Sequence, residues 1–251
     1  MAGLQTGGGT SAVAASAHAG CQRFRLTDPF LTSKPRKALA TQLGFPDSSA
    51  GIPEARWMRA MTFEHLVHSD KFVSELLTKT IGQLKLPRPK AVHRVTCGNS
   101  ISNTAKALAE AHVRASSAGD ATMITGLGVP YLHLEHESAT AVLPDFAIVC
   151  PRYLGTRVIG SWLIMGDAKD YERVRSRIDD GRMLKGFLQV ALGAESAADW
   201  SKLPEGMEVH RSGALAVPRN AFLQPEAVVE VLDDHRAEVR VRAEERLERV
   251  Y

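Results

Sequence analysis

Apolar residues first recur in a regular pattern between residues 54 and 83. Large apolar side chains return there at roughly helical spacing, which places them on one face of a helix. Ser69-Asp70 interrupts the pattern and can cap a second helix that begins at Lys71. The apolar positions are Trp57, Met61, Leu66, Phe72, Leu76 and Ile81.

Strand-like patterns occupy the middle of the chain. Phe146–Cys150 and Val158–Met165 have the length and the β-branched or aromatic content of strands. Tyr131–Glu137 alternates between apolar and polar residues and predicts a strand before them. Glu208–Val217 alternates loosely and predicts a last core strand, and Val92–Cys97 predicts a further short strand.

Helices and a loop are expected between and after these strands. Ser102 or Asn103 can cap a helix that continues to about Ala115. Gly119–Gly128 is predicted to be a loop. Residues 226–251 are dense in Arg and Glu with a thin apolar stripe, which predicts a C-terminal helix.

The order of these patterns predicts the fold class. Helix, strand, strand, strand, helix and strand in succession indicate an α/β core with a mixed sheet of about four strands, flanked by helices. We expect a disordered tail over residues 1–20, which are rich in Gly, Ala, Ser and Thr. The tail is followed by a helical N-terminal subdomain over 21–95, the α/β core over 96–220 and a charged C-terminal helix over 221–251.

Composition narrows the class of protein. The 251 residues are 44% hydrophobic, which is ordinary for a globular core, and no apolar run is long enough to span a bilayer. The N-terminus lacks the basic and apolar regions of a secretory signal, so we expect a cytoplasmic protein without membrane contact. Cys21, Cys97 and Cys150 are scattered, which argues against a disulfide framework, a zinc site or an iron–sulfur cluster.

Charge is informative mainly through its distribution. The net charge is +3, and residues 224–251 contain eight acids and five Arg, a local charge of −3 that leaves +6 for the remainder. A moderately basic body is compatible with a polyanionic partner, although many soluble proteins share this feature.

The ends of two predicted strands carry the best candidates for chemistry. Asp145 precedes the first strand, and Asp167 and Lys169 end the second. Because residues i and i+2 of a strand point to the same face, Asp167 and Lys169 project side by side. Mg²⁺ is usually held by one or two carboxylates, waters and substrate phosphate. Asp145 and Asp167 can supply the carboxylates and Ala168 a backbone carbonyl. Lys169 can orient or activate a water, or neutralise charge on a phosphate.

These residues resemble the motif of the PD-(D/E)XK nuclease superfamily. Pro144-Asp145 is similar to the first half and Asp167-Ala168-Lys169 to the second, and the resemblance covers residues 100–215. The motifs are short, and a second Pro-Asp at Pro46-Asp47 has no strand after it and is set aside. The resemblance implies a restriction-endonuclease-like core and a nuclease that uses Mg²⁺ or Mn²⁺ to hydrolyse phosphodiester bonds, in DNA more than in RNA.

The resemblance also implies a third residue at the metal site. In this superfamily the helix before the first core strand often carries an acidic residue, and Glu110 is the candidate here. A histidine holds a comparable place in the recombination-nuclease branch, which makes His112 the second candidate, and Glu135 on the predicted strand is the third. Glu110 and His112 are two apart, so at most one of them points at the site.

A basic segment and a helix follow the second motif. Arg182, Lys185 and Gln189 fall at positions i, i+3 and i+7 and share one face of this helix. With Arg177 before the helix, this face is where nucleic-acid phosphates would lie, and Gln189 can contact the site. The recombination-nuclease branch has a Tyr four residues after this Gln, where this chain has Gly193. The residues expected mostly on the opposite face are Leu184, Phe187, Leu188 and Ala191.

The sequence therefore predicts a metal-dependent nuclease of a defence (including antiviral), recombination or repair system. It contains no nucleic-acid-reading element, so we expect a homodimer or a partner ATPase or effector subunit to assist it. The alternative is a non-catalytic nucleic-acid-binding or scaffold subunit on the same fold. A plain α/β interaction protein, whose surface lies in its N-terminal or C-terminal helices, is a further alternative.

Overall fold

The computed structural model describes residues 54–133, 141–173 and 177–248, which form five helices and seven strands. The predicted tail over 1–20, and residues 21–53, lie outside the described residues. The helices are α6 (Glu54–Val67), α7 (Asp70–Gln83), α8 (Ile101–Ala118), α9 (Asp180–Asp199) and α10 (Asp233–Glu248). The strands are β1 (Val92–Ser100), β2 (Ala121–Leu127), β3 (Phe146–Leu154), β4 (Arg157–Ala168), β5 (Met207–Val209), β6 (Ser212–Pro218) and β7 (Pro225–Val231).

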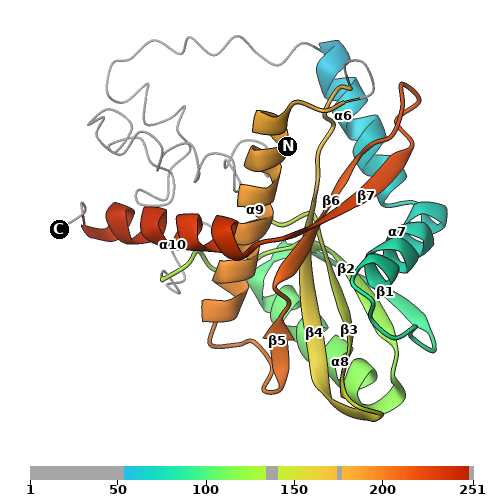
Figure 1. The fold of residues 1–251 in the computed structure, drawn as a ribbon, viewed down its shortest axis with the longest axis vertical. Coiled ribbons are helices and arrows are strands. Elements are labelled where there is room, and N and C mark those ends of the chain that lie inside the picture. The colour runs from blue at the N-terminus through green and yellow to red at the C-terminus, as the bar shows by residue number, and fades with distance from the viewer. Residues whose placement is uncertain (1–53, 134–140, 174–176, 249–251) are drawn as a thin grey trace.

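The strands of the described residues form one mixed sheet (Figure 1). Their order is β1-β2-β3-β4-β6-β7, and β5 also pairs with β4. β1 runs parallel to β2, and β4 runs parallel to β5 and β6. The other neighbouring pairs are antiparallel. The predicted α/β class with a mixed sheet is confirmed, but the sheet has seven strands instead of about four.

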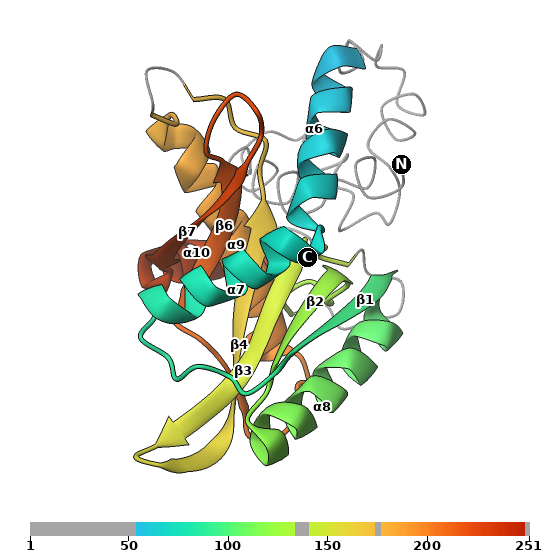
Figure 2. The ribbon, with the colours of Figure 1, turned by 90° about the vertical axis from the view of Figure 1, so that its right-hand side faces the viewer.

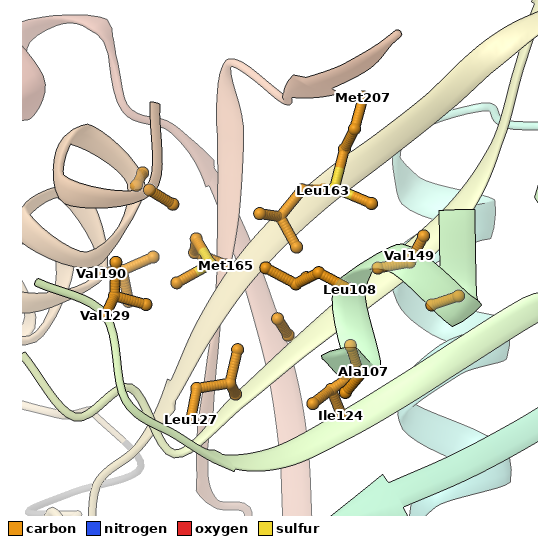
Figure 3. Close-up of a cluster of buried hydrophobic side chains, with 14 of the residues drawn as sticks. Ala107, Leu108, Ile124, Leu127, Val129, Val149, Leu163, Met165, Val190 and Met207 are labelled. Atoms are coloured by element: carbon orange, nitrogen blue, oxygen red, sulfur yellow. The ribbon is translucent and has the colours of Figure 1, made fainter. Parts of the chain in front are cut away.

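Helices cover both faces of the sheet (Figure 2). On β4, Leu163 and Met165 pack toward α8 and α9, whereas Ile164 packs toward α7 on the other side. This alternation is the period of two that a strand imposes on its side chains. The core cluster on the α8 and α9 side is shown in Figure 3, where Leu108 of α8 and Val190 of α9 meet the strands.

The predicted pair of N-terminal helices is confirmed. α6 and α7 break at Ser69, whose hydroxyl accepts a hydrogen bond from the backbone N–H of Phe72 at 3.4 Å and so caps α7. Phe72, Leu76 and Ile81 are buried in the same core cluster as β3 and β6, so α7 forms one layer of the α/β core. None of the described helices has the length and apolar character to cross a membrane.

Two predicted elements were wrong in the middle of the chain. Gly119–Gly128, predicted as a loop, contains β2, which is buried on both faces and therefore shows no alternation of apolar and polar residues. Tyr131–Glu137, predicted as a strand, has a bridge and a turn over its described part, Tyr131–His133. The helix after β1 begins at Ile101 behind an N-cap at Ser100, slightly earlier than predicted.

The C-terminal part also differs from the prediction. The predicted strand Glu208–Val217 divides into β5 and β6. Residues 226–231, predicted as helix, belong to β7, which pairs antiparallel with β6, and the helix α10 begins only at Asp233. α10 packs on α9 through Val239 and Ala243, and the buried carboxylate of Glu195 on α9 forms ion pairs with Arg236 and Arg240 of α10.

Candidate active site

Strand pairing brings the two motifs together. Phe146 of β3 pairs with Gly166 of β4, so Asp145 immediately before β3 lies beside Asp167 near the end of β4. On the other side of β4, Asp167 pairs with Leu215 of β6. The two aspartates therefore lie at one end of the sheet in its interior, where β4 has a neighbour on each side.

The aspartates share the face of the sheet that α8 and α9 cover. Leu163 and Met165 of β4 face these helices, and Asp167 is the next residue of the same alternation. Asp145 likewise continues the alternation of Ala147 on β3, which belongs to the same core cluster. The expectation that both carboxylates converge at one sheet end agrees with this register.

Short polar contacts join the motif residues. Lys169 Nζ lies 2.5 Å from Asp167 Oδ2, and the Ala168 N–H donates a hydrogen bond of 2.8 Å to Asp145 Oδ2. The Lys169 N–H donates to the Ala216 carbonyl of β6 at 2.9 Å, which fixes the backbone just beyond β4. Asp167 is 5% exposed, so its carboxylate is almost removed from solvent.

Burial and neighbouring charges perturb the pKa values of both ionisable groups of the second motif. Burial is the main cause that raises the pKa of Asp167 well above its usual range, and the charge and a hydrogen bond of Asp145 raise it further. The ammonium of Lys169 opposes this change. Burial disfavours the charge on Lys169, but the carboxylates of Asp167 and Asp145 outweigh it and raise the Lys169 pKa. Lys169 is therefore protonated at neutral pH.

Helix α9 places Gln189 over this end of the sheet. An added Cβ at Gly186 would meet Leu215 Cδ1 at 2.7 Å, and one at Gly193 would meet Pro144 Cγ at 3.0 Å. Gln189 lies between these glycines on the same helical face and is buried, at 8% exposure. Gln189 was predicted to share one polar, basic face with Arg182 and Lys185. Those two side chains are exposed, whereas Gln189 is buried.

Gly193 occupies the position where the recombination-nuclease branch has a Tyr. A Cβ added to Gly193 would lie 3.0 Å from Pro144 Cγ and 3.2 Å from Met165 Cε, so any side chain there would have to displace these neighbours. Tyr171 lies nearby instead, half-buried after Lys169, and its hydroxyl is 3.4 Å from the Cβ position of Gly186 on α9. Burial raises the pKa of Tyr171, while Lys169 lowers it and Asp167 raises it, so all three groups are neighbours.

The structure does not bring Glu110 or His112 to the aspartates. Glu110 is on the exposed side of α8, and its carboxylate pairs with Arg114 at 3.3 Å. His112 Nδ1 is 2.8 Å from the hydroxyl of Ser161, which is six residues and about 20 Å before Asp167 along β4. Glu135 lies outside the described residues.

The part of α8 nearest the site has no carboxylate. Thr104 in its first turns is buried, accepts a hydrogen bond from the Gly128 N–H at 2.9 Å and donates to the Ser100 carbonyl at 2.8 Å. Within the described residues, no group of three or more His, Cys, Asp or Glu side chains is placed to hold a metal ion. Within this part of the chain, Asp145 and Asp167 are therefore a pair of carboxylates to which no third metal-ligating group is added.

Two contacts near the site had no signal in the sequence. Arg59 of α6 donates a hydrogen bond of 2.7 Å to Asp170, the residue after Lys169, and thereby ties the N-terminal helices to the second motif. Arg173 Nε donates to the Pro218 carbonyl of β6 at 2.7 Å, and its guanidinium pairs with Glu226 at 2.8 Å. These contacts join segments far apart in the chain, which periodicity cannot detect.

The cations expected to contact phosphates lie around the first turn of α9. Arg182 and Lys185 are exposed there, and Arg177 is exposed just before the helix, although residues 174–176 lie outside the described residues. Leu184, expected on the buried face, is 53% exposed.

Comparison with models of known protein families found no match, and no curated protein matches the chain. The chemistry of the site therefore has to be inferred from its own residues.

Proposed function

We propose that this chain is a Mg²⁺- or Mn²⁺-dependent nuclease that hydrolyses phosphodiester bonds, in DNA more than in RNA. The observation that carries the proposal is the convergence of Asp145, Asp167 and Lys169 at one end of adjacent antiparallel strands. The order of elements α8, β2, β3, β4, α9 and β6 around them also agrees with a restriction-endonuclease-like core.

The donor set suits a hard divalent cation. Asp145 and Asp167 offer carboxylate oxygens, and Ala168 between Asp167 and Lys169 adds a backbone carbonyl. With both carboxylates ionised and Lys169 protonated, the three groups carry a net charge of about −1 in a largely buried place, which either a proton on Asp167 or a bound cation would compensate. When bound, such a cation would polarise a phosphate oxygen and promote attack by water.

Each residue of the chain then has a distinct task. The protonated Lys169 contributes a fixed positive charge and a hydrogen-bond donor for the phosphate or for the attacking water. Asp145 holds the backbone of Ala168 in place through its hydrogen bond and thus keeps the second motif in register. Gln189 and Tyr171 would contact the substrate, and the exposed Arg182, Lys185 and Arg177 would attract its backbone.

Nuclease assays with several substrates test the proposal. Supercoiled plasmid, linear duplex and single strands are incubated with Mg²⁺, Mn²⁺ or EDTA, beside the variant Lys169→Ala. We expect cleavage that needs metal and is lost in the variant, and the substrate pattern will separate endonuclease from exonuclease activity. Cleavage that survives in EDTA or in the variant would refute the proposed chemistry.

The competing proposal is a non-catalytic nucleic-acid-binding or scaffold subunit. It is favoured by the absence of a third metal-ligating side chain among the described residues, because the Asp167–Lys169 pair and the Asp145–Ala168 hydrogen bond can also serve to stabilise the strand ends. Calorimetric titration with Mg²⁺ separates the two. A scaffold binds no Mg²⁺ at Asp145 and Asp167, whereas the proposed nuclease loses its Mg²⁺ affinity in Asp167→Asn.

A further inference from the structure

The turn between β6 and β7 stands at the same end of the sheet as the candidate active site. Leu215 of β6 pairs with Asp167, and β6 ends three residues later at Pro218, about 10 Å beyond that level. The turn itself comprises residues 219–224. Figures 1 and 2 show this hairpin beside α6.

The turn is held in one conformation by its own hydrogen bonds. Asn220 Oδ1 accepts from the backbone N–H groups of Phe222 at 3.1 Å and Gln224 at 3.3 Å, and its Nδ2 donates to Gln224 Oε1 at 3.0 Å. The Arg219 N–H donates to the Gln224 carbonyl at 2.6 Å, which closes the hairpin. Leu223 adopts a positive φ of 59° that turns the chain sharply.

This conformation presents one aromatic ring to solvent. Leu223 is 8% exposed and anchors the turn in the core cluster beneath it, whereas the neighbouring Phe222 is 84% exposed. Phe222 is the most exposed large apolar side chain among the described residues. A ring held outward by an ordered turn keeps its contact surface at little entropic cost on binding.

The charges around the ring favour a polyanion. Arg219 is exposed in the turn, which contains no acid. The nearest acid along the chain, Glu226, is neutralised by Arg173 at 2.8 Å. Arg173 also binds the Pro218 carbonyl, so the segment that follows Lys169 is attached directly to the base of the hairpin.

We propose that Phe222 stacks on an unpaired nucleobase of the nucleic-acid strand whose phosphodiester lies at Asp145 and Asp167. The inference rests on the proposed function for the identity of the ligand. An aromatic ring stacks on any base, because every base has a π-face, and the adjacent Arg219 binds the backbone. The structure thus assigns to the β6–β7 turn the task of holding a single-stranded segment beside the site.

Fluorescence tests the contact directly. Phe222→Trp places an indole at the turn, and Leu154→Trp is the matched control, because Leu154 is 72% exposed at the β3–β4 turn on the opposite end of the sheet. Each variant is titrated with a single strand of about 20 nucleotides, longer than the site of one binding module, in EDTA, which prevents cleavage, and the wild-type signal is subtracted. We expect quenching of the new indole in Phe222→Trp and no quenching of the new indole in Leu154→Trp. Equal quenching in both variants, or none in either, overturns the inference.

Affinity measurements separate stacking from charge. Phe222→Ala should bind the same single strand about 5- to 160-fold more weakly than the wild type, the range expected for one stacked base. On an abasic strand of the same length and charge, wild type and variant should bind equally. An equal loss on both strands, or no loss on either, overturns the inference.

These experiments distinguish a failure of the stacking inference from a failure of the proposed nuclease function. If the wild type cleaves with metal while Phe222→Ala binds normally and Phe222→Trp shows no quenching, that combination overturns only the stacking. Base-dependent binding through Phe222 in a protein that never cleaves supports the stacking and overturns the nuclease. Wild-type protein that binds no strand at all overturns the inference, whatever its affinity for metal.

Discussion

Gly166 of β4 faces Phe146 of β3 so closely that an added Cβ would lie 2.0 Å from Phe146 Cε2. Both residues adjoin the candidate site, since Phe146 follows Asp145 and Gly166 precedes Asp167. The phenyl ring fills the space that any larger residue at 166 would need. The spacing between the two aspartates therefore depends on this pair of neighbours.

Gly166→Ala should destabilise the protein and displace Asp167. The Phe146 ring is fully buried and cannot move away without loss of packing, so we expect a loss of about 2–3 kcal/mol in the free energy of unfolding. Chemical denaturation measures it. Adding Phe146→Leu should recover part of the loss, because the smaller side chain makes room. Gly82→Ala is the control, since nothing lies within 4 Å of its Cβ position. Additive losses in the double variant would contradict the proposed clash.

Asp145→Asn should make the metal-free protein more stable. The amide keeps an oxygen for the Ala168 N–H but removes the charge that repels Asp167. We expect a gain of about 1 kcal/mol in EDTA, because relief of like-charge repulsion at a functional site commonly stabilises a protein. Thermal unfolding with and without Mg²⁺ measures it. Mg²⁺ should raise the Tm of the wild type and leave that of the variant unchanged, and an equal rise in both would refute the assignment of Asp145.

The interaction between Asp145 and Asp167 also predicts how the free energy of unfolding depends on pH in EDTA. The folded-state pKa of Asp167 lies above its unfolded value, so the native state binds a proton more tightly than the unfolded state does. This contribution to stability is complete below the unfolded pKa and is lost as pH rises through the folded pKa. The wild type should therefore gain stability relative to Asp145→Asn as pH falls from neutral toward the unfolded pKa. Parallel pH profiles for the two proteins would contradict the coupling.

Glu195→Gln should loosen α10 from α9. The Glu195 carboxylate is buried and pairs with Arg236 and with Arg240, the latter at 3.0 Å. Loss of this charge leaves two guanidinium groups poorly compensated, so we expect a loss of about 3 kcal/mol in stability. Denaturant unfolding provides the measurement. Glu238→Gln is the control, since its pair with Arg242 is partly exposed and should contribute less than about 0.5 kcal/mol. Similar losses in both variants would contradict a special role for Glu195.

The sequence allowed prediction of what depends on local pattern. Strand length and composition around Asp145 and Asp167 were enough to expect two neighbouring strands, and Ser69 was enough to expect a cap. β2 was not predicted because a strand that is buried on both faces does not alternate between apolar and polar residues. Its sequence is also bounded by glycines, which is typical of a loop. β7 was predicted as helix because its charged residues continue into α10 without a change of composition that would mark a boundary.

The residues around the aspartates required the three-dimensional structure. Glu110 matched the expected helix, but the register of α8 against the sheet decides which side chains point inward, and no periodicity gives that register. Gln189 was predicted on the correct helix and on a basic face shared with Arg182 and Lys185, but its side chain is buried whereas those two are exposed. The glycines at 186 and 193 bring that face against the sheet instead.

Cleavage by site variants under one set of conditions tests the central claim most directly. Asp145→Asn, Asp167→Asn and Lys169→Ala are compared with wild type and with Glu110→Gln, an exposed carboxylate on α8, in single-turnover assays with Mg²⁺. We predict that the three site variants lose at least about 100-fold in rate while remaining folded, as expected when charge stabilisation is removed. Glu110→Gln should cleave at the wild-type rate. Wild-type rates in Asp145→Asn and Asp167→Asn would contradict the claim that these carboxylates form the active site.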